Sequence, residues 1–341
     1  MDSDCESAVC DDTMGVCTSE AQVLYASPTG PDAGTCLQAM PCSISQAVAL
    51  VDGTKTTVKL ASGTYTAAVV LKGPSMTLHG FGATINASSA TPLFDVSGDS
   101  KLNIVGVSLN NAAQAVLGCR DTNSVNVDRA AITGFNAVTG CALTMTRSTV
   151  HGTNSAQVLM ILSGATSIQR TLIDGGGGVT TATATDTAHF TNSVFANLGN
   201  STNGGFGGNL TISYSTIVNT RVVCPGAVDP ICIGGTATNP CINNSVVLNT
   251  LAGAPTDTIT GSCAVTYSAV FPQATALGSG TNDKIGSDPM LKDPANGDNH
   301  LTVASPAVDA ADFQATNPID FDGTSRPQGN RNDMGAFEFK P

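Results

Sequence analysis

The sequence predicts a right-handed parallel β-helix, a solenoid of short strands, with a capping helix at its N-terminal end and a cap at its C-terminal end. Three observations predict this fold. A strand-like template recurs about every 22 residues, pairs of cysteines are spaced at the same period, and the composition suits strands and tight turns. In such a solenoid three short strands per turn stack on the next turn at the usual strand spacing of about 4.8 Å.

The composition excludes several other classes of protein. The chain has 341 residues, of which 41% are hydrophobic, 12% are charged and 36 are glycine. A charge-rich disordered chain and a helical bundle would both need more charged residues. The net charge is −12 with only 14 basic residues, so we expect no nucleic-acid partner. No apolar run approaches the roughly 18–20 residues that span a bilayer, so the chain is not expected to cross a membrane.

The repeat is an alternation of apolar and polar residues followed by a small residue. Leu102-Asn-Ile104 and Val125-Asn-Val127 begin two clear copies. The second apolar position falls at residues 104, 127, 145, 168, 190, 212, 242 and 265, in steps of 23, 18, 23, 22, 22, 30 and 23. Leucine-rich repeats have this length but need a leucine and asparagine frame that is absent here.

The small residue of the template predicts a column of inward-facing hydroxyls. We expect these hydroxyls to satisfy one another along the solenoid axis. The column comprises Ser148, Thr171, Ser193, Ser215, Ser245 and Ser268.

The eleven cysteines predict disulfides and therefore a secreted or cell-surface location. Cys119 and Cys141 are 22 residues apart, as are Cys241 and Cys263, so each pair would join neighbouring turns. Two further predicted pairs close loops, Cys36 with Cys42 and Cys224 with Cys232. The pairing of Cys5, Cys10 and Cys17 stays open.

Three regions follow from the patterns. Residues 1–20 are predicted to form a short disulfide-stapled stalk, residues 21–285 the β-helix, and residues 286–341 a capping module. Within the second region, Ile44, Ala47 and Val51 have helical spacing. Ser43 as N-cap and Gln46 three residues later match a capping box, which predicts a capping helix near residues 43–51.

Two stretches resemble known families. Val58-Lys-Leu60-Ala-Ser-Gly-Thr-Tyr65 and Met76-Thr-Leu78-His-Gly-Phe-Gly-Ala-Thr-Ile85 resemble the opening turns of the pectin-lyase-like β-helix superfamily. The segment from Ser305-Pro-Ala-Val-Asp309 to Asp333-Met-Gly-Ala-Phe-Glu338 is similar to the end module of bacterial choice-of-anchor Q surface proteins. The first resemblance implies polysaccharide bound along the parallel sheets. The second implies a secreted or surface-displayed protein.

The resemblance to choice-of-anchor Q proteins also implies that this end module is the C-terminal cap. Two interpretations of its acidic residues are open. Asp322, Asp333 and Glu338 near Arg326 and Arg331 fit salt bridges and turns within a cap. Alternatively, calcium could bind in a cluster of carboxylates. The candidate calcium ligands are Asp309, Asp320, Asp322 and Asp333.

The sequence identifies no catalytic set. The paired aspartates of polygalacturonase-type hydrolases, in Asn-Thr-Asp and Asp-Asp motifs, do not occur in the repeats. The candidates for binding lie at the corner two residues after the second apolar position, which is occupied by Arg129, Arg147 and Arg170 and then by Asn192. With Asp174 these arginines are candidate ligand-binding residues for anionic groups of a glycan.

The corner leaves a catalytic and a purely structural interpretation open. Arg147, Arg170 and His151 are the candidates for proton abstraction in a lyase. His151 and Asp174 fall on equivalent positions of neighbouring turns. In the structural interpretation the three arginines pair with Asp121, Asp128 and Asp174 on a solvated corner.

Three functions are therefore considered. The first is a non-catalytic glycan-binding or adhesion protein, and the second is a polysaccharide lyase or glycoside hydrolase acting on acidic polysaccharide. The third is a structural role in an envelope or matrix. A polysaccharide or surface glycan is the expected partner, and calcium is the one cofactor considered.

Overall fold

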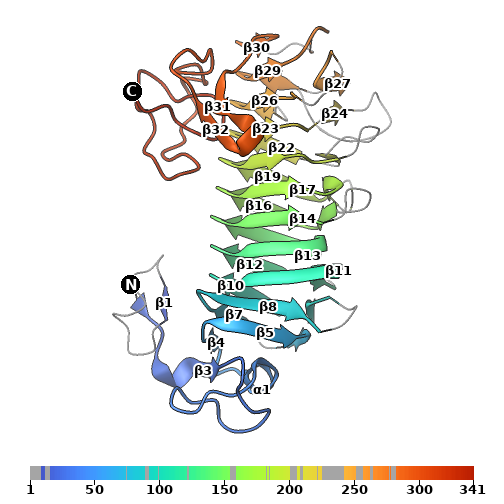
Figure 1. The fold of residues 1–341 in the computed structure, drawn as a ribbon, viewed down its shortest axis with the longest axis vertical. Helices are drawn as coiled ribbons and strands as arrows, with labels where there is room; N and C mark the ends of the chain where they lie inside the picture. Colours follow the sequence, from blue (N-terminus) through green and yellow to red (C-terminus); the bar gives the residue numbers. More distant parts are fainter. Residues whose placement is uncertain are drawn as a thin grey trace. The chain divides into compact units, whose positions relative to one another are not determined.

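The computed structural model describes residues 9–11, 16–73, 75–88, 92–98, 100–120, 123–153, 159–181, 183, 185–199, 206–207, 210–220, 222–224, 242–250, 256–261, 264–275, 277 and 282–341. The chain divides into two compact units, Met1–Thr144 and Met145–Pro341. Each unit contains parallel coils of a β-helix, as predicted, and each is described by itself (Figure 1).

Unit 1 contains three columns of stacked strands. The first column is parallel throughout and comprises β3 (Val23–Ala26), β4 (Thr57–Leu60), β7 (Met76–His79), β10 (Lys101–Val105) and β12 (Ser124–Asp128). The second comprises β5 (Gly63–Ala67), β8 (Ala83–Ala87) and the first parts of β11 (Ser108–Cys119) and β13 (Ala131–Thr146). The third comprises β6 (Val69–Lys72), β9 (Phe94–Ser97) and later parts of β11 and β13.

The register of unit 1 follows the apolar template. Ile104 lies beside both Leu78 and Val127, and all three are 0–2% exposed. Asn103, between two buried neighbours, therefore points outward, because successive side chains of a strand alternate between faces.

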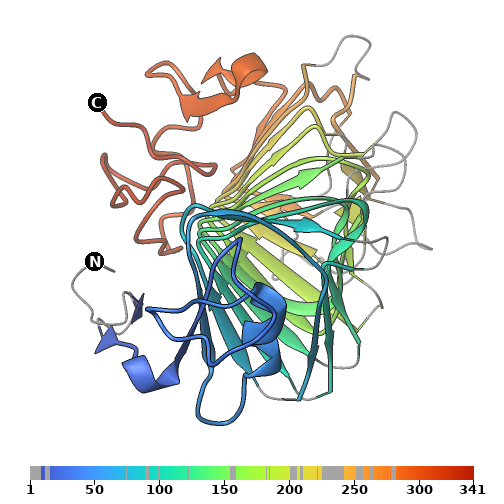
Figure 2. The same cartoon turned by 60° about the horizontal axis from the view of Figure 1, so that its bottom comes forward.

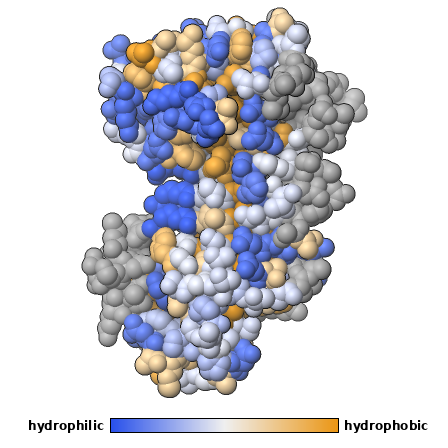
Figure 3. Space-filling model, viewed as in Figure 1, coloured by the Kyte–Doolittle hydropathy of each residue, from blue (hydrophilic) through white to orange (hydrophobic). Residues whose placement is uncertain are grey.

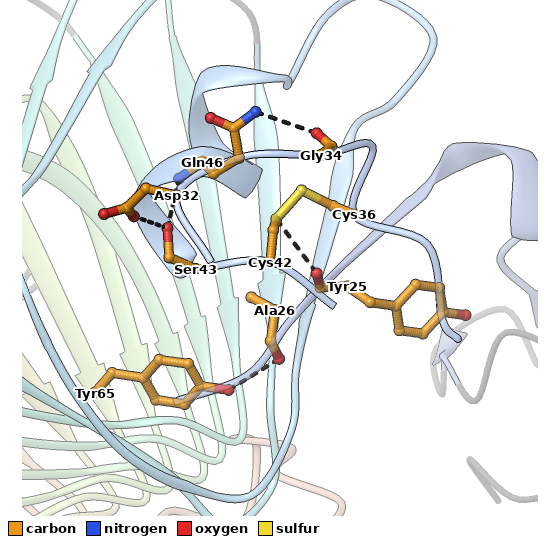
Figure 4. The surroundings of a disulfide bond; sticks show 9 residues. All are labelled: Tyr25, Ala26, Asp32, Gly34, Cys36, Cys42, Ser43, Gln46 and Tyr65. Atoms are coloured by element: carbon orange, nitrogen blue, oxygen red, sulfur yellow. Dashed lines mark hydrogen bonds between the residues drawn. A yellow bond between two sulfur atoms is a disulfide. The ribbon is translucent and has the colours of Figure 1, made fainter. Parts of the chain in front are cut away.

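The predicted capping helix is α1 (Ile44–Ala49), which lies beside β3 and β4 (Figure 2). The backbone N–H of Gln46 donates to Ser43 Oγ at 3.1 Å, so the predicted N-cap is present. The other half of the capping box is not formed. The Gln46 side chain donates instead to the carbonyl oxygen of Gly34 in the preceding loop (Figure 4). A hairpin precedes β3 and comprises β1 (Cys10–Asp11) and β2 (Val16–Cys17).

Unit 2 also contains three columns of stacked strands. Its first column comprises β16 (Ala165–Gln169), β19 (Thr187–Thr191), β22 (Leu210–Ser213), β25 (Ile242–Asn243) and β28 (Val265–Thr266). Its second comprises β14 (Thr149–Gly152), β17 (Leu172–Gly175), β20 (Val194–Ala196), β23 (Thr216–Val218), β26 (Val246–Leu248), β29 (Ala269–Phe271) and β30 (Lys284–Ile285). Its third comprises β15 (Leu159–Leu162), β18 (Gly178–Thr181) and β21 (Phe206–Gly207). A further pair joins β24 (Val222–Cys224) to β27 (Ile259–Gly261).

The irregular 30-residue step is still one turn. Ile212 pairs with Ile242, which pairs with Val265, so the template positions stay in register.

The predicted hydroxyl column is buried, but its hydrogen bonds differ from the expectation. Ser215 Oγ donates to the carbonyl oxygen of Ser213 at 2.8 Å and accepts the backbone N–H of Ser193 at 3.1 Å. The same pattern links Ser215 to Ser245 and Ser245 to Ser268. Each of these hydroxyls therefore bonds to a carbonyl oxygen of its own turn and to an N–H of the preceding turn, and not to another hydroxyl of the column.

The column ends on a carboxylate. The backbone N–H of Ser268 donates to Asp283 Oδ1 at 3.0 Å, and Asp283 directly precedes β30. Burial raises the pKa of Asp283 to about 6, since the carboxyl is partly removed from water.

The C-terminal segment of unit 2 packs against its own strands. It contains the antiparallel pair β31 (Leu291–Asp293) and β32 (Asp298–Leu301). Leu291, Leu301, Ala307, Ala311 and Met334 share one apolar cluster with residues of β23, β26 and β29. This apolar packing fixes residues 291–334 on the coils of unit 2.

Two of the predicted disulfides are present. Cys36–Cys42 and Cys119–Cys141 have Cα–Cα distances of 4.9 and 5.0 Å, and the second joins neighbouring turns. The predictions for Cys224–Cys232 and Cys241–Cys263 concern Cys232, Cys241 and Cys263, which lie outside the described residues. The stalk, β-helix and capping-module boundaries stay predictions. Within the described part of the chain, no helix is long and apolar enough to cross a membrane.

Candidate functional site

The corner residues singled out from the sequence share one backbone conformation. Arg129, Arg147, Arg170 and Asn192 have φ of 49–50°, in the left-handed region. Arg129, Arg170 and Asn192 each follow a first-column strand, Arg147 follows the end of β13, and each turns the chain into the next strand. This region favours glycine and asparagine, so arginine here is held by its surroundings and not by local preference.

Arg170 contacts the C-terminal segment of its own unit. Its Nε donates to the carbonyl oxygen of Phe321 at 2.9 Å. Its terminal nitrogen lies so close to Gly323 that a Cβ there would be 2.8 Å away. Arg170 therefore holds the turn of residues 320–323. Its guanidinium, which the sequence analysis proposed as a ligand-binding group, contacts the protein's own backbone.

The next corner residues along unit 2 hold the same C-terminal segment. Each later corner contacts an earlier residue of that segment. Asn192 exchanges side-chain hydrogen bonds with Asn317, at 3.1 and 2.6 Å. Tyr214 donates its hydroxyl to the carbonyl oxygen of Ala315 at 3.0 Å. The backbone N–H of Asp312 donates to the side chain of Asn244 at 2.6 Å. Residues 312–323 therefore run along the corners as a strap.

Arg129, in unit 1, has a different environment. Its Nε lies 2.9 Å from Asp128 Oδ2, as the structural interpretation predicted. Its guanidinium carbon also lies 4.8 Å from the ring centroid of Phe81. The side chain is thus fixed by a neighbouring carboxylate and by an aromatic ring. Asp121, the other predicted partner in unit 1, lies outside the described residues.

Arg147 is exposed on the surface of unit 2. Asp174, which the sequence offered as an arginine partner or ligand-binding residue, instead faces His151. The two residues are paired in register on β14 and β17, and His151 Nδ1 lies 3.0 Å from Asp174 Oδ1. Their side chains are 51% and 33% exposed, so the pair lies open to solvent. The structure therefore brings these two predicted residues together.

The acidic residues of the C-terminal segment bind backbone amides. Asp320 accepts the N–H groups of Thr324 and Glu338 through its two oxygens. Asp333 accepts those of Asp309 and Phe339, and burial raises its pKa to about 6. Both oxygens of each carboxylate therefore accept backbone N–H groups within the C-terminal segment.

The remaining two candidate calcium ligands also have partners within the segment. Asp309 Oδ1 accepts the N–H of Arg331 at 2.8 Å, and Asp322 Oδ2 lies 2.8 Å from His300 Nε2. Burial opposes protonation of His300, but hydrogen bonds to Asp322 and Asp298 outweigh it and raise its pKa. Among the described residues, no three His, Cys, Asp or Glu side chains converge as a metal site would.

A neutral polar array was not identified from the sequence. On the first column of unit 1, Asn126 Nδ2 donates to Asn103 Oδ1 at 2.8 Å, and Asn103 Nδ2 donates to Thr77 Oγ1 at 3.2 Å. The second column carries Asn110, which donates to Asn86 at 3.0 Å. The signal was present in the repeat, because residues 103 and 126 occupy the same outward position one turn apart.

The second column presents only uncharged side chains at its outward positions in four successive turns. They are Thr64 and Thr66, Thr84 and Asn86, Ser108 and Asn110, and Ala131 and Thr133. On the face drawn in Figure 3, white and pale-blue residues of intermediate hydropathy are interspersed with patches of saturated blue and of orange. The second column of unit 1 therefore offers regular donors and acceptors without charged side chains in these four turns.

A comparison with solved structures identifies a fold relative. The crystal structure of pectate lyase Pel9A matches with a TM-score of 0.57 and 15% sequence identity, covering 96% of this chain and 98% of that one. This likeness supports the pectin-lyase-like parallel β-helix fold predicted from the sequence. No protein-family model and no curated protein sequence matches the chain.

Proposed function

We propose that this protein is an extracellular, non-catalytic protein that binds polysaccharide. The observation that supports this most is the hydroxyl and amide array on the outward faces of unit 1. Its rows repeat at the strand spacing of about 4.8 Å and present both donors and acceptors. A polysaccharide repeats its hydroxyl groups along an extended chain, so an array of this chemistry complements it.

Charge supports a neutral ligand over an acidic one. The chain carries a net charge of −12, which opposes the approach of a polyanion. Corner arginines are also engaged within the protein. Arg170 holds the C-terminal strap and Arg129 lies against Asp128.

Two observations support an extracellular location. Disulfides persist in oxidising compartments, and Cys36–Cys42 and Cys119–Cys141 are both formed. The similarity of residues 305–338 to choice-of-anchor Q end modules favours display at a cell surface. A structural role in an envelope or matrix would use the same location, and polysaccharide binding distinguishes the two.

The second candidate function is a polysaccharide lyase acting on acidic polysaccharide. It is favoured by the exposed pair of His151 and Asp174, and by the fold shared with a pectate lyase. With Nδ1 held by the carboxylate, His151 Nε2 would accept the proton alpha to a uronate carboxylate. The carbon–oxygen bond to the leaving sugar would then break, and the product would carry a double bond.

One experiment separates these functions. The purified protein is incubated with insoluble cellulose, chitin and xylan and with soluble polygalacturonate, and bound protein and ultraviolet absorbance are recorded together. We expect retention on at least one neutral polysaccharide without product formation. Release of an unsaturated uronate that is lost in His151→Ala would establish the lyase instead. Retention on none of the three insoluble polysaccharides would overturn the proposed binding function.

A further inference from the structure

One aromatic side chain at the corner of unit 1 is exposed and yet held in place. Phe81 follows β7 at the turn into β8 and is 43% exposed. A single exposed phenylalanine is common on a protein surface and by itself indicates nothing. The surroundings of this ring set it apart.

Three neighbours fix the Phe81 ring. The ring lies across Gly106, where an added Cβ would be 2.5 Å from a ring carbon. The buried imidazole of His79 meets it edge to face, with centroids 5.4 Å apart. The Arg129 guanidinium carbon lies 4.8 Å from its centroid.

The strand register explains why these groups meet. Val105 pairs with His79 on one side and with Asp128 on the other. The turns that follow these three strand ends therefore stack at one corner. Gly106, with φ of 71°, makes that corner without a side chain and leaves room for the ring of the preceding turn.

The groups beside the ring are planar and polar. Asp128 and Arg129 form an ion pair whose side chains are 22% and 30% exposed, so both still reach solvent. On the adjoining strand face run Asn126, Asn103 and Thr77, already ordered by their own hydrogen bonds. The corner thus combines an immobilised apolar ring with ordered donors and acceptors.

We infer that this corner, centred on Phe81, is where the protein binds a neutral polysaccharide. The inference rests on the proposed function and assigns its site and ligand class. A sugar ring presents an apolar face of C–H groups and an edge of hydroxyls. Its face stacks on Phe81, and its hydroxyls bond to the Asp128–Arg129 pair and to the asparagine column. Because Phe81 and the asparagines are held before binding, little side-chain entropy is lost.

The pairing of Arg129 with Asp128 determines the ligand class. A uronate carboxylate placed at this corner would meet Asp128 as well as Arg129, and their opposite charges largely cancel. A neutral sugar uses both groups, accepting from the guanidinium and donating to the carboxylate. Lys59, whose Nζ lies 3.0 Å from His79 Nδ1, adds one cation near the ring, but the net charge of −12 opposes the approach of a polyanion, so neutral chains are preferred over acidic ones.

The test is affinity electrophoresis of the full chain in gels that contain hydroxyethyl cellulose, galactomannan, soluble xylan or polygalacturonate. We expect Phe81→Ala to weaken binding to the neutral probe that retards the wild-type protein most, by about tenfold, the effect of 1.4 kcal/mol. Phe81→Tyr retains the ring and should bind as wild type. Phe313→Ala is the matched control, because Phe313 is 68% exposed in unit 2.

Each outcome has one meaning. If no probe retards the wild-type protein, both the proposed function and this site are overturned. If the wild-type protein binds and Phe81→Ala binds equally well, only the site is overturned. Stronger retardation by polygalacturonate than by every neutral probe overturns the ligand class. Equal melting temperatures of wild type and Phe81→Ala show that the ring acts in binding and not in folding.

Discussion

The buried hydroxyl column offers the sharpest test of how the coils of unit 2 are held together. Ser215→Ala removes a hydroxyl that donates to the carbonyl oxygen of Ser213 and accepts the N–H of Ser193. Ser193 and Ser215 are both 0% exposed, so water cannot replace the lost partner. A buried polar group left without a partner costs about 1–3 kcal/mol, and we expect about 2 kcal/mol here.

Thermal unfolding followed by circular dichroism measures this effect. For a cooperative unit of this size, about 2 kcal/mol lowers the melting temperature by about 4–8 °C. Ser215→Thr is the matched control, because Thr171 occupies the equivalent position and donates to the carbonyl oxygen of Gln169 in the same way. The reasoning is refuted if Ser215→Ala melts with the wild-type protein, or if the threonine variant is destabilised as much as the alanine variant.

Three further predictions concern the carboxylate at the end of the hydroxyl column, the arginine that holds the strap, and the disulfide between neighbouring turns. The pKa of Asp283 is raised to about 6, so its contribution to stability is fully present below about pH 4 and is lost as pH rises through 6. Asp283→Asn should therefore match the stability of wild type at pH 4 and exceed it by about 1 kcal/mol at pH 8, allowing for solvent screening. The prediction is contradicted if the difference in melting temperature between the two proteins becomes smaller as the pH rises. Arg170→Ala should speed hydrogen exchange of residues 318–324, because the bond to the Phe321 carbonyl is lost; equal exchange in both proteins counts against the strap. Replacing Cys119 and Cys141 with alanine opens a 22-residue link and should cost about 3 kcal/mol in urea unfolding; an unchanged midpoint would show that the strands alone hold this turn.

The strand register was predictable because it depends on local chemistry. Alternation of apolar and polar residues fixes which face of a strand is buried, and a slip of one residue would expose every apolar side chain. The repeat near 22 residues therefore placed Ile104 beside Val127, and it placed Cys119 beside Cys141. The helix near residue 44 was predictable for the same reason, since Ser43 caps the amide of Gln46 three residues away.

The sequence by itself thus determined the β-helix, its register, one capping helix and a disulfide between turns, because each arises from neighbours in the chain or from a repeated spacing. Only the tertiary structure decided what the corners do. Arg147 and Arg170 look equivalent in the repeat, yet Arg170 is held by Phe321, 151 residues away. Phe81 gains its fixed ring only where Gly106 leaves space on the next turn. Such contacts depend on which surfaces the folded coils bring together, and a local pattern does not encode that choice.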